Sequence, residues 1–212
     1  WNEKRLSADG RAFMAIHTHP NSHAGYYPDA KQMALKLLFD PINGEILGAQ
    51  GVGIEGVDKR IDVIATAIRG GITAPELADL ELAYAPPFGS AKDPVNMLGY
   101  ISENLISGLV ETAQWNQIDE FLDKGFDLVD VRTSEEFGRG NIPRSRNIPI
   151  DEIRNRISEL MNKNILVNCQ VGQRGHTATM LLKELGFNAV NLDGGYLTWS
   201  NSPIANEEIS YV

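Results

Sequence analysis

The strongest constraint on the fold is a short apolar run that leads through a glycine-containing loop into a helical pattern. Residues 165–167 are Ile-Leu-Val, which is typical of a buried strand. Beyond the loop, apolar residues recur at the spacing of one helix face up to Gly186, namely Ala178, Leu181, Leu182 and Leu185. Residues 169–175 therefore join a strand to the start of a helix, as in a doubly wound parallel sheet.

Cys169 opens this loop and is the only cysteine in the 212-residue chain. Free N–H groups and the positive end of the following helix should face its sulfur. We expect Arg174 to curl back over the loop, so that both features favour the thiolate and hold an attached or approaching anion. We interpret Cys169 and Arg174 as catalytic, the alternative for Cys169 being a small buried hydrophobe. The other loop residues are predicted to bind substrate: Gln170, Val171, Gly172, Gln173 and Gly175.

The spacing between Cys169 and Arg174 separates two chemistries. Four residues intervene, one fewer than in the loops of protein tyrosine phosphatases, which cradle a tetrahedral oxyanion. The tighter ring suits a terminal sulfur on the cysteine. A Cys-dependent phosphatase or arsenate reductase stays as the less favoured alternative.

Segments around the loop resemble the rhodanese family of sulfurtransferases. Upstream, Leu-Val-Asp-Val-Arg at 128–132, Glu-Glu-Phe at 135–137 and Gly-Asn-Ile-Pro at 140–143 are similar to the opening of that family. Downstream, Leu-Asp-Gly-Gly-Tyr at 192–196 is similar to its closing strand and glycine turn. The resemblance implies a Cys169 persulfide, loaded by a small sulfur donor and emptied by a thiol acceptor.

Two residues depart from the rhodanese pattern. Asn141 stands where a His is usual, and Arg144 stands where a Gly is usual. Neither belongs to the Cys169 loop, so we expect both to leave the chemistry intact.

Two charged residues near the loop, Asp130 and Arg132, are predicted to have different roles. Asp130 ends a buried strand, where a carboxylate needs N–H groups or an arginine, so we interpret it as a structural organiser near the site. Arg132 is predicted to bind substrate and to add positive potential. It would share an anion-attracting mouth with Arg139, Arg144, Arg146 and Arg174. For all but Arg132 and Arg174, surface pairing with Glu135 and Glu136 is the alternative.

Residues 1–108 resemble the dimerisation domain of pyridine nucleotide-disulfide oxidoreductases, in the coenzyme A-disulfide reductase and NADH oxidase branch. The similar motifs lie at 23–28, 56–62 and 83–96. The resemblance implies a homodimer in which Tyr26 and Tyr84 reach the partner's flavin and redox cysteine and stabilise a departing coenzyme A thiolate. The alternative is that both tyrosines only pack at the interface.

The two resemblances together imply the fused coenzyme A-disulfide reductase/rhodanese proteins, some of which are described as persulfide or polysulfide reductases. Because the FAD and NAD(P)H domains of that family are missing and the chain starts at Trp1, we expect a C-terminal fragment. It should bind none of FAD, NAD(P)H and coenzyme A by itself. A noncatalytic dimerisation and docking unit is the alternative function. The sulfur donor, the acceptor and the preference between NADH and NADPH stay open.

Local patterns predict two domains, residues 1–108 and 111–212, of α/β class. In the first, Asn43-Gly44 predicts a hairpin between strands at 35–40 and 45–49, and a helix face over 57–68 ends at Gly70-Gly71. The result is an α+β domain with a largely antiparallel sheet. In the second, strands at 128–131, 165–168 and 189–192 alternate with helices, one of them around Ile153, Ile157 and Leu160.

Several other functions are disfavoured. Gly51 to Gly56 fits GxGxxG, but a hairpin precedes it, so its glycines more plausibly allow close strand–helix approach than dinucleotide binding. His17, His19 and His23 lack the spacing and acidic neighbours of a metal site. The net charge of -9 argues against nucleic acid. No apolar run approaches the roughly 18 residues of a membrane span, and we expect a cytoplasmic protein.

Overall fold

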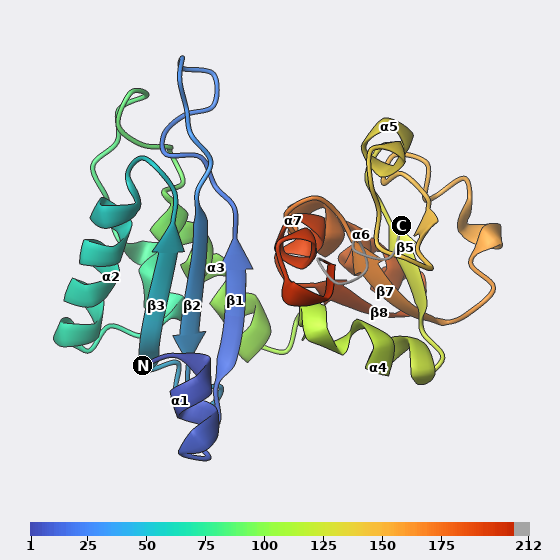
Figure 1. Ribbon diagram of the computed structural model, residues 1–212, viewed down its shortest axis with the longest axis horizontal. Coiled ribbons are helices and arrows are strands. Elements are labelled where there is room, and N and C mark those ends of the chain that lie inside the picture. The colour runs from blue at the N-terminus through green and yellow to red at the C-terminus, as the bar shows by residue number, and fades with distance from the viewer. Residues whose placement is uncertain (206–212) are drawn as a thin grey trace. The chain divides into compact units, whose positions relative to one another are not determined.

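The chain folds as two compact units, described here from a computed structural model that covers residues 1–205. The first unit runs from Trp1 to Leu109, and the second begins at Val110 (Figure 1). Each unit has its own apolar core. Within residues 1–205, no helix is both long enough and apolar enough to cross a membrane.

The first unit is built on an antiparallel sheet in the order β1-β2-β3. Its strands are β1 (Met14–Thr18), β2 (Ala34–Phe39) and β3 (Ile46–Val52). The hairpin predicted at Asn43-Gly44 is confirmed, because β2 and β3 pair antiparallel around it. Gly44 has a φ of 73°, which glycine adopts readily, and the Asp40 carboxylate accepts from the Ile42 and Asn43 N–H groups.

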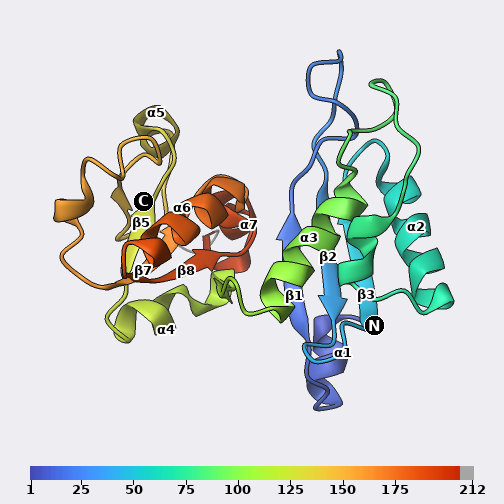
Figure 2. The same cartoon turned by 180° about the vertical axis from the view of Figure 1, so that it is seen from behind.

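Helices α2 (Val57–Gly70) and α3 (Pro94–Ile106) pack on one face of this sheet, as Figure 2 shows from behind. The short helices α1 (Glu3–Ala8) and η1 (Pro75–Asp79) complete the unit. The predicted helix over 57–68 is confirmed, but its buried face is different. Arg60, Ile64 and Ala67 are buried, whereas Ile68 is 43% exposed. The shift arises because Arg60 has a buried acidic partner, described below.

The second unit contains a parallel sheet in the order β4-β8-β7-β5-β6, which confirms the predicted fold class. Its strands are β4 (Thr112–Ala113), β5 (Asp127–Asp130), β6 (Arg146–Asn147), β7 (Asn164–Asn168) and β8 (Asn188–Leu192). Its helices are η2 (Trp115–Gln117), α4 (Ile118–Asp123), α5 (Ser134–Gly138), η3 (Ile157–Glu159), α6 (Gln173–Glu184) and α7 (Gly195–Ser200).

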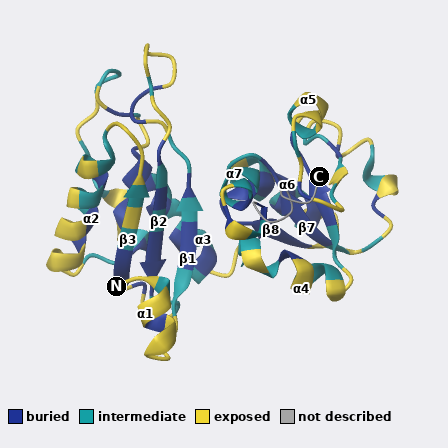
Figure 3. Cartoon of the chain, in the orientation of Figure 1, coloured by how far each residue is buried: buried dark blue, intermediate teal, exposed yellow. Residues whose placement is uncertain are grey.

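Two apolar clusters lie on opposite faces of this parallel sheet. Val129, Ile165 and Val167 pack with α6 residues, whereas Leu128 and Leu166 pack in a separate cluster that contains Trp199. Alternate residues of β5 and β7 thus enter different clusters, as the two-residue period of a strand requires. Figure 3 shows these strands buried and the outer faces of α4 and α5 exposed.

The helix expected around Ile153, Ile157 and Leu160 is wrong. Residues 150–160 form successive turns, with only the short 3₁₀ helix η3 among them. Most backbone hydrogen bonds here span three residues, and the Arg146 guanidinium binds the Glu159 carbonyl oxygen at 2.7 Å. The apolar spacing correctly indicates burial, because Ile153 and Leu160 are buried. A series of turns can bury residues at this spacing as well as a helix can.

Arg144 explains why glycine is usual at its position. Its φ is 68°, in the left-handed region that disfavours residues with a Cβ atom. The departure from the rhodanese pattern therefore has a conformational cost.

We predict that Arg144→Gly raises the free energy of unfolding by about 1 kcal/mol, because glycine removes the left-handed strain. Arg139→Gly is the matched control, since Arg139 has an ordinary φ of -77° and should lose stability instead. Urea unfolding of both variants measures the difference. Equal losses in the two variants would contradict the strain at Arg144.

Candidate active site

Cys169 follows the last residue of β7, which lies between β5 and β8 in the sheet. The carboxyl ends of parallel strands are where such sheets carry their sites. The cysteine is fully buried, and the Gly172 N–H donates to its Sγ atom at 3.1 Å. The sulfur therefore lies beneath its own loop, in contact with a backbone donor.

Backbone N–H groups of helix α7 bind carbonyl oxygens of the Cys169 loop. The Tyr196 N–H donates to the Cys169 carbonyl oxygen at 2.7 Å, and the Leu197 N–H donates to that of Gln170 at 2.9 Å. The Gly172 carbonyl oxygen accepts from the His176 N–H at 2.9 Å and the Asn191 side chain at 3.2 Å. The first N–H groups of α7, which lack partners within the helix, are satisfied in this way. These carbonyls are engaged elsewhere, while the Gly172 N–H faces the sulfur.

Three glycines make this close packing possible. Gly172 has a φ of 94° at the start of α6, and Gly195 has a φ of 61° at the start of α7. A Cβ atom on Gly195 would lie 2.4 Å from the Cys169 carbonyl oxygen. One on Gly175 would lie 2.2 Å from Asn191 Oδ1 and 3.7 Å from the sulfur. The predicted loop residues Val171 and Gln173 are half-buried and exposed, respectively.

Asp130 and Arg132 form a buried network beneath the loop. Asp130 accepts from the Arg132 backbone N–H at 2.9 Å, from its guanidinium at 2.8–3.0 Å, and from Asn168 Nδ2 at 3.0 Å. The guanidinium also donates to the Gly140 carbonyl oxygen at 2.8 Å and to Gln170 Oε1 at 3.2 Å. Asp130 thus joins two strand ends, and Arg132 ties them to the loop.

Arg132, predicted to bind substrate, is buried and already paired. Its side chain is 1% exposed, and it is paired with Asp130 and lies 4.1 Å from the Tyr196 ring centroid. Three other arginines of the expected mouth also have partners. Arg139 pairs with Glu135, Arg146 binds a carbonyl oxygen, and Arg174 has an acidic partner. The alternative of surface pairing with Glu135 is thus seen for Arg139, whereas the anion-attracting mouth stays a prediction.

The acidic partner of Arg174 is Glu136 of α5. The two side chains form an ion pair through two contacts. Nη1 and Nη2 of Arg174 lie 2.7 and 2.6 Å from the two carboxylate oxygens. The hydrogen bond from Arg174 is the main reason that the pKa of Glu136 falls to about 2, and the Thr133 N–H also contributes. The pKa of Arg174 is raised, first by Glu136 and to a smaller degree by the charges of Cys169 and Asp130. We expected Arg174 to serve the loop directly, and sequence reasoning missed this partner.

His176 is a further residue that sequence reasoning passed over. It lies on α6 two positions beyond Arg174, and burial lowers its pKa. The imidazole is therefore held in its neutral form more strongly than an exposed histidine.

Tyr26 and Tyr84 meet at the loops of the first unit. Their hydroxyl oxygens lie 2.9 Å apart, although 58 residues separate them in sequence. Tyr26 is 77% exposed and Tyr84 is 47% exposed, so the pair stands in solvent. The hydrogen bond with Tyr26 is the main reason that the pKa of Tyr84 is raised. Tyr27 instead packs edge-on against His23, with ring centroids 5.7 Å apart.

A buried ion pair positions the loops that carry these tyrosines. Arg60 is 1% exposed, and its Nη2 lies 2.9 Å from both Asp93 Oδ2 and the Ser22 carbonyl oxygen. Asp93 also caps α3 by accepting from the Val95 N–H at 3.0 Å. Arg60 was missed because arginine is rarely buried. The Asp93-Pro94 pair signals the start of α3, but it does not show that this carboxylate has a buried arginine partner.

The glycines from Gly51 to Gly56 do not form a dinucleotide site. They follow β3, which pairs antiparallel with β2, so the crossover between parallel strands is lacking in this unit. Cβ atoms on Gly51 and Gly53 would lie 2.5 and 2.9 Å from Val57 side-chain atoms. The prediction that these glycines permit close strand–helix approach is confirmed.

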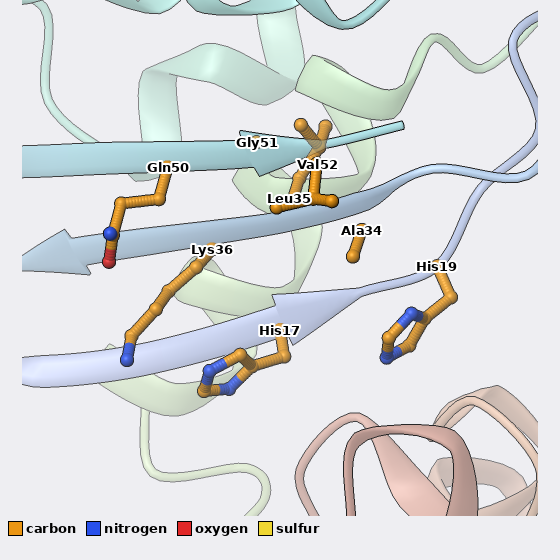
Figure 4. Close-up of a pocket in the computed structure, with 8 residues that line it drawn as sticks. All are labelled: His17, His19, Ala34, Leu35, Lys36, Gln50, Gly51 and Val52. Carbon is orange, nitrogen blue, oxygen red and sulfur yellow. The ribbon is translucent and has the colours of Figure 1, made fainter. Parts of the chain in front are cut away.

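The three histidines of the first unit lie in different surroundings. His17 and His19 line a hollow over the sheet together with Lys36 and Gln50 (Figure 4). His23 is buried, with its Nδ1 atom 3.2 Å from the Ala24 carbonyl oxygen. Among residues 1–205, no three His, Cys, Asp or Glu side chains gather in a way that could hold a metal ion.

Comparisons with known proteins agree with this two-part architecture. Residues 2–94 match the family described as pyridine nucleotide-disulphide oxidoreductase, dimerisation domain, and residues 114–202 match the rhodanese-like domain. The crystal structure of reduced Bacillus anthracis CoADR-RHD is 47% identical, with a TM-score of 0.91 over 94% of this chain and 36% of that chain. A NAD-dependent persulfide reductase from A. fulgidus is 37% identical, with a TM-score of 0.84 over the same shares.

A coenzyme A disulfide reductase from Staphylococcus haemolyticus is 43% identical over 93 residues, which make up 44% of this chain and 21% of that protein. The fold and the site thus define a chain in which a dimerisation domain is joined to a rhodanese-like domain. Over those two regions it matches the models of the pyridine nucleotide-disulphide oxidoreductase dimerisation domain and the rhodanese-like domain. It spans about a third of the length of the two solved structures above.

We predict that Gly195→Ala lowers the free energy of unfolding by roughly 2 kcal/mol more than Gly186→Ala does. Both glycines have left-handed φ values, 61° and 80°, but only a Cβ atom on Gly195 meets the Cys169 carbonyl oxygen. The Gly195 variant should also expose the buried thiol, so that Cys169 reacts faster with iodoacetamide. Equal stability losses and equal alkylation rates would contradict the anchoring role of α7.

Proposed function

We propose that the second unit is a sulfurtransferase that carries sulfur as a persulfide on Cys169. The observation that carries this proposal is the 3.1 Å contact between the Gly172 N–H and Sγ, in a loop where the carbonyls of Cys169, Gln170 and Gly172 are bonded elsewhere. A ring of N–H groups suits a thiolate and the terminal sulfur of a persulfide, because both hold negative charge. Membership of the rhodanese-like family supports the same chemistry.

The proposed reaction is a double displacement. The Cys169 thiolate attacks the outer sulfur of a donor, such as thiosulfate or a thiol persulfide. A bond forms between Sγ and that sulfur, and the donor's sulfur–sulfur bond breaks as its electron pair leaves with sulfite or a thiolate. A thiol acceptor, as its thiolate, then attacks the terminal sulfur and releases the Cys169 thiolate. Two steps with a covalent intermediate replace one difficult transfer.

In the intact protein, we propose that this unit works beside an NAD(P)H-dependent flavoprotein reductase of coenzyme A disulfide or a persulfide. The names of the relatives, coenzyme A disulfide reductase and NAD-dependent persulfide reductase, support this assignment. FAD, NAD(P)H and coenzyme A are the proposed cofactors and carrier, in a cytoplasmic homodimer formed through residues 1–108. The antiparallel sheet of the first unit offers no dinucleotide-binding crossover, so we assign none of its residues to holding FAD.

Tyr26 and Tyr84 are the proposed catalytic residues of the first unit. Their hydroxyls already form a pair, and one of them can donate outward while the other supports it. Such a donor stabilises the charge that develops on a sulfur leaving group. The outward exposure of both side chains fits a role toward a partner surface.

We predict that thiosulfate adds one sulfur atom to the protein and that Cys169→Ser abolishes the addition, because Cys169 is the only thiol. Intact-mass spectrometry before and after treatment measures it. Cyanide or a thiol should then remove the sulfur. An unchanged mass with every tested donor, thiosulfate and persulfides alike, would contradict sulfur transfer through Cys169.

We predict that replacing Tyr26 and Tyr84 together with Phe slows reduction of coenzyme A disulfide or persulfide in the intact flavoprotein on the order of tenfold or more, through loss of a hydrogen bond to a charged group. FAD content and the sulfur transfer of Cys169 should stay unchanged, because the tyrosines and Cys169 belong to different units. Steady-state NAD(P)H oxidation measures the effect. Wild-type reduction by the double variant would assign the tyrosines to interface packing.

A further inference from the structure

We infer that Glu136 is a positioning residue that lowers the preference of the Cys169 site for dianionic sulfur donors. This inference rests on the proposed sulfur transfer and adds a specificity determinant to it. Glu136 acts through Arg174, which it holds at two points, rather than by touching the reacting sulfur.

The first step is the geometry of the pair. Glu136 lies on α5 and Arg174 on α6, 38 residues apart in sequence, and both oxygens of the carboxylate are used. The Thr133 N–H fixes Glu136 from behind at 2.9 Å in a capping box. The side chains are 28% and 35% exposed, so the pair is partly shielded from solvent and salt. A fixed two-point pair of this kind is stronger than a mobile surface contact.

The second step is the sum of charges around the sulfur. Arg132 is matched by Asp130, and Arg174 is matched by Glu136. Two positive and two negative side chains therefore sum to zero beside Cys169. A donor with two negative charges meets backbone N–H dipoles but no uncompensated cation. Arg174 lies in the first turn of α6 next to Gly175, where a Cβ atom would be 3.7 Å from the Cys169 sulfur, so the Arg174 pair lies near the reacting atom.

The third step concerns the positive charge of Arg174, which Glu136 compensates. A guanidinium has five N–H donors, and the pair with Glu136 occupies only two of them. Neutralising Glu136 would leave Arg174 in place as an uncompensated cation at the loop. The attraction for a dianion should then grow about twice as much as that for a monoanion, because the Coulomb energy is proportional to charge.

The test compares two donors of similar size on the 212-residue chain, with cyanide as the acceptor. Thiosulfate carries two negative charges and methanethiosulfonate carries one. Each donates its outer sulfur to the Cys169 thiolate, releasing sulfite or methanesulfinate with the electron pair of the broken bond. Cyanide then removes the sulfur as thiocyanate, which is measured. The readout is kcat/KM for thiosulfate divided by kcat/KM for methanethiosulfonate.

We expect Glu136→Gln to raise this ratio about tenfold, through a lower KM for thiosulfate with little change in kcat. Glu136→Asp, which keeps the charge, should restore the wild-type ratio. Glu135→Gln is the matched control, because Glu135 is 76% exposed and pairs with Arg139 instead. It should leave the ratio unchanged.

A ratio that stays the same in Glu136→Gln, or that falls, would overturn the inference while leaving sulfur transfer intact. Absence of thiocyanate from the wild type with both donors would instead overturn the proposed function. A measurement on the wild type covers the case in which the variant does not fold. With the site charges summing to zero, added salt should not lower the ratio. A ratio that falls steeply with salt would show that Arg174 attracts dianions despite Glu136, and would contradict the inference.

Discussion

The hydrogen bonds from the first N–H groups of α7 to the carbonyls of Cys169 and Gln170 are the constraint on which the site depends. They satisfy a helix start that would otherwise need water, and they turn loop carbonyls away from the sulfur. Gly195 permits the contact because any larger residue would strike the Cys169 carbonyl oxygen. The nucleophile is thus prepared by a helix that follows it by some 25 residues, as well as by the helix that begins beside it.

Buried ion pairs organise both units in the same way. Arg60 and Asp93 are 33 residues apart, whereas Arg132 and Asp130 are neighbours in sequence and reach distant segments through Gln170 and Asn168. Each arginine also binds a backbone carbonyl oxygen. Such pairs are a weak source of stability, because removing charges from water costs about as much as the pairing returns. Their contribution here is position. One fixes the Cys169 loop to two strand ends, and the other fixes the loops that carry Tyr26 and Tyr84.

The alternation of strands and helices in the second unit, the hairpin and the helix after Cys169 could be predicted because apolar spacing and turn residues report them locally. The turns over residues 150–160 could not, since buried Ile153 and Leu160 have the same spacing in turns as in a helix. Side-chain partners were harder still. The Thr133-x-x-Glu136 spacing of a capping box distinguishes Glu136 from Glu135, but it does not show that Glu136 binds Arg174. Arg60 looks like an exposed residue. These contacts depend on tertiary structure, which brings residues up to 38 positions apart together.

A crystal structure of the protein after exposure to thiosulfate tests the central claim most directly. The account predicts one additional atom bonded to Cys169 Sγ, surrounded by loop N–H groups, with the Tyr196 N–H still bound to the Cys169 carbonyl oxygen and Glu136 still paired with Arg174. A bare sulfur in crystals soaked with thiosulfate and with persulfide donors would contradict it. So would a sulfur adduct seen only after the loop has turned its carbonyls inward, because the N–H-lined loop would then have no part in holding it.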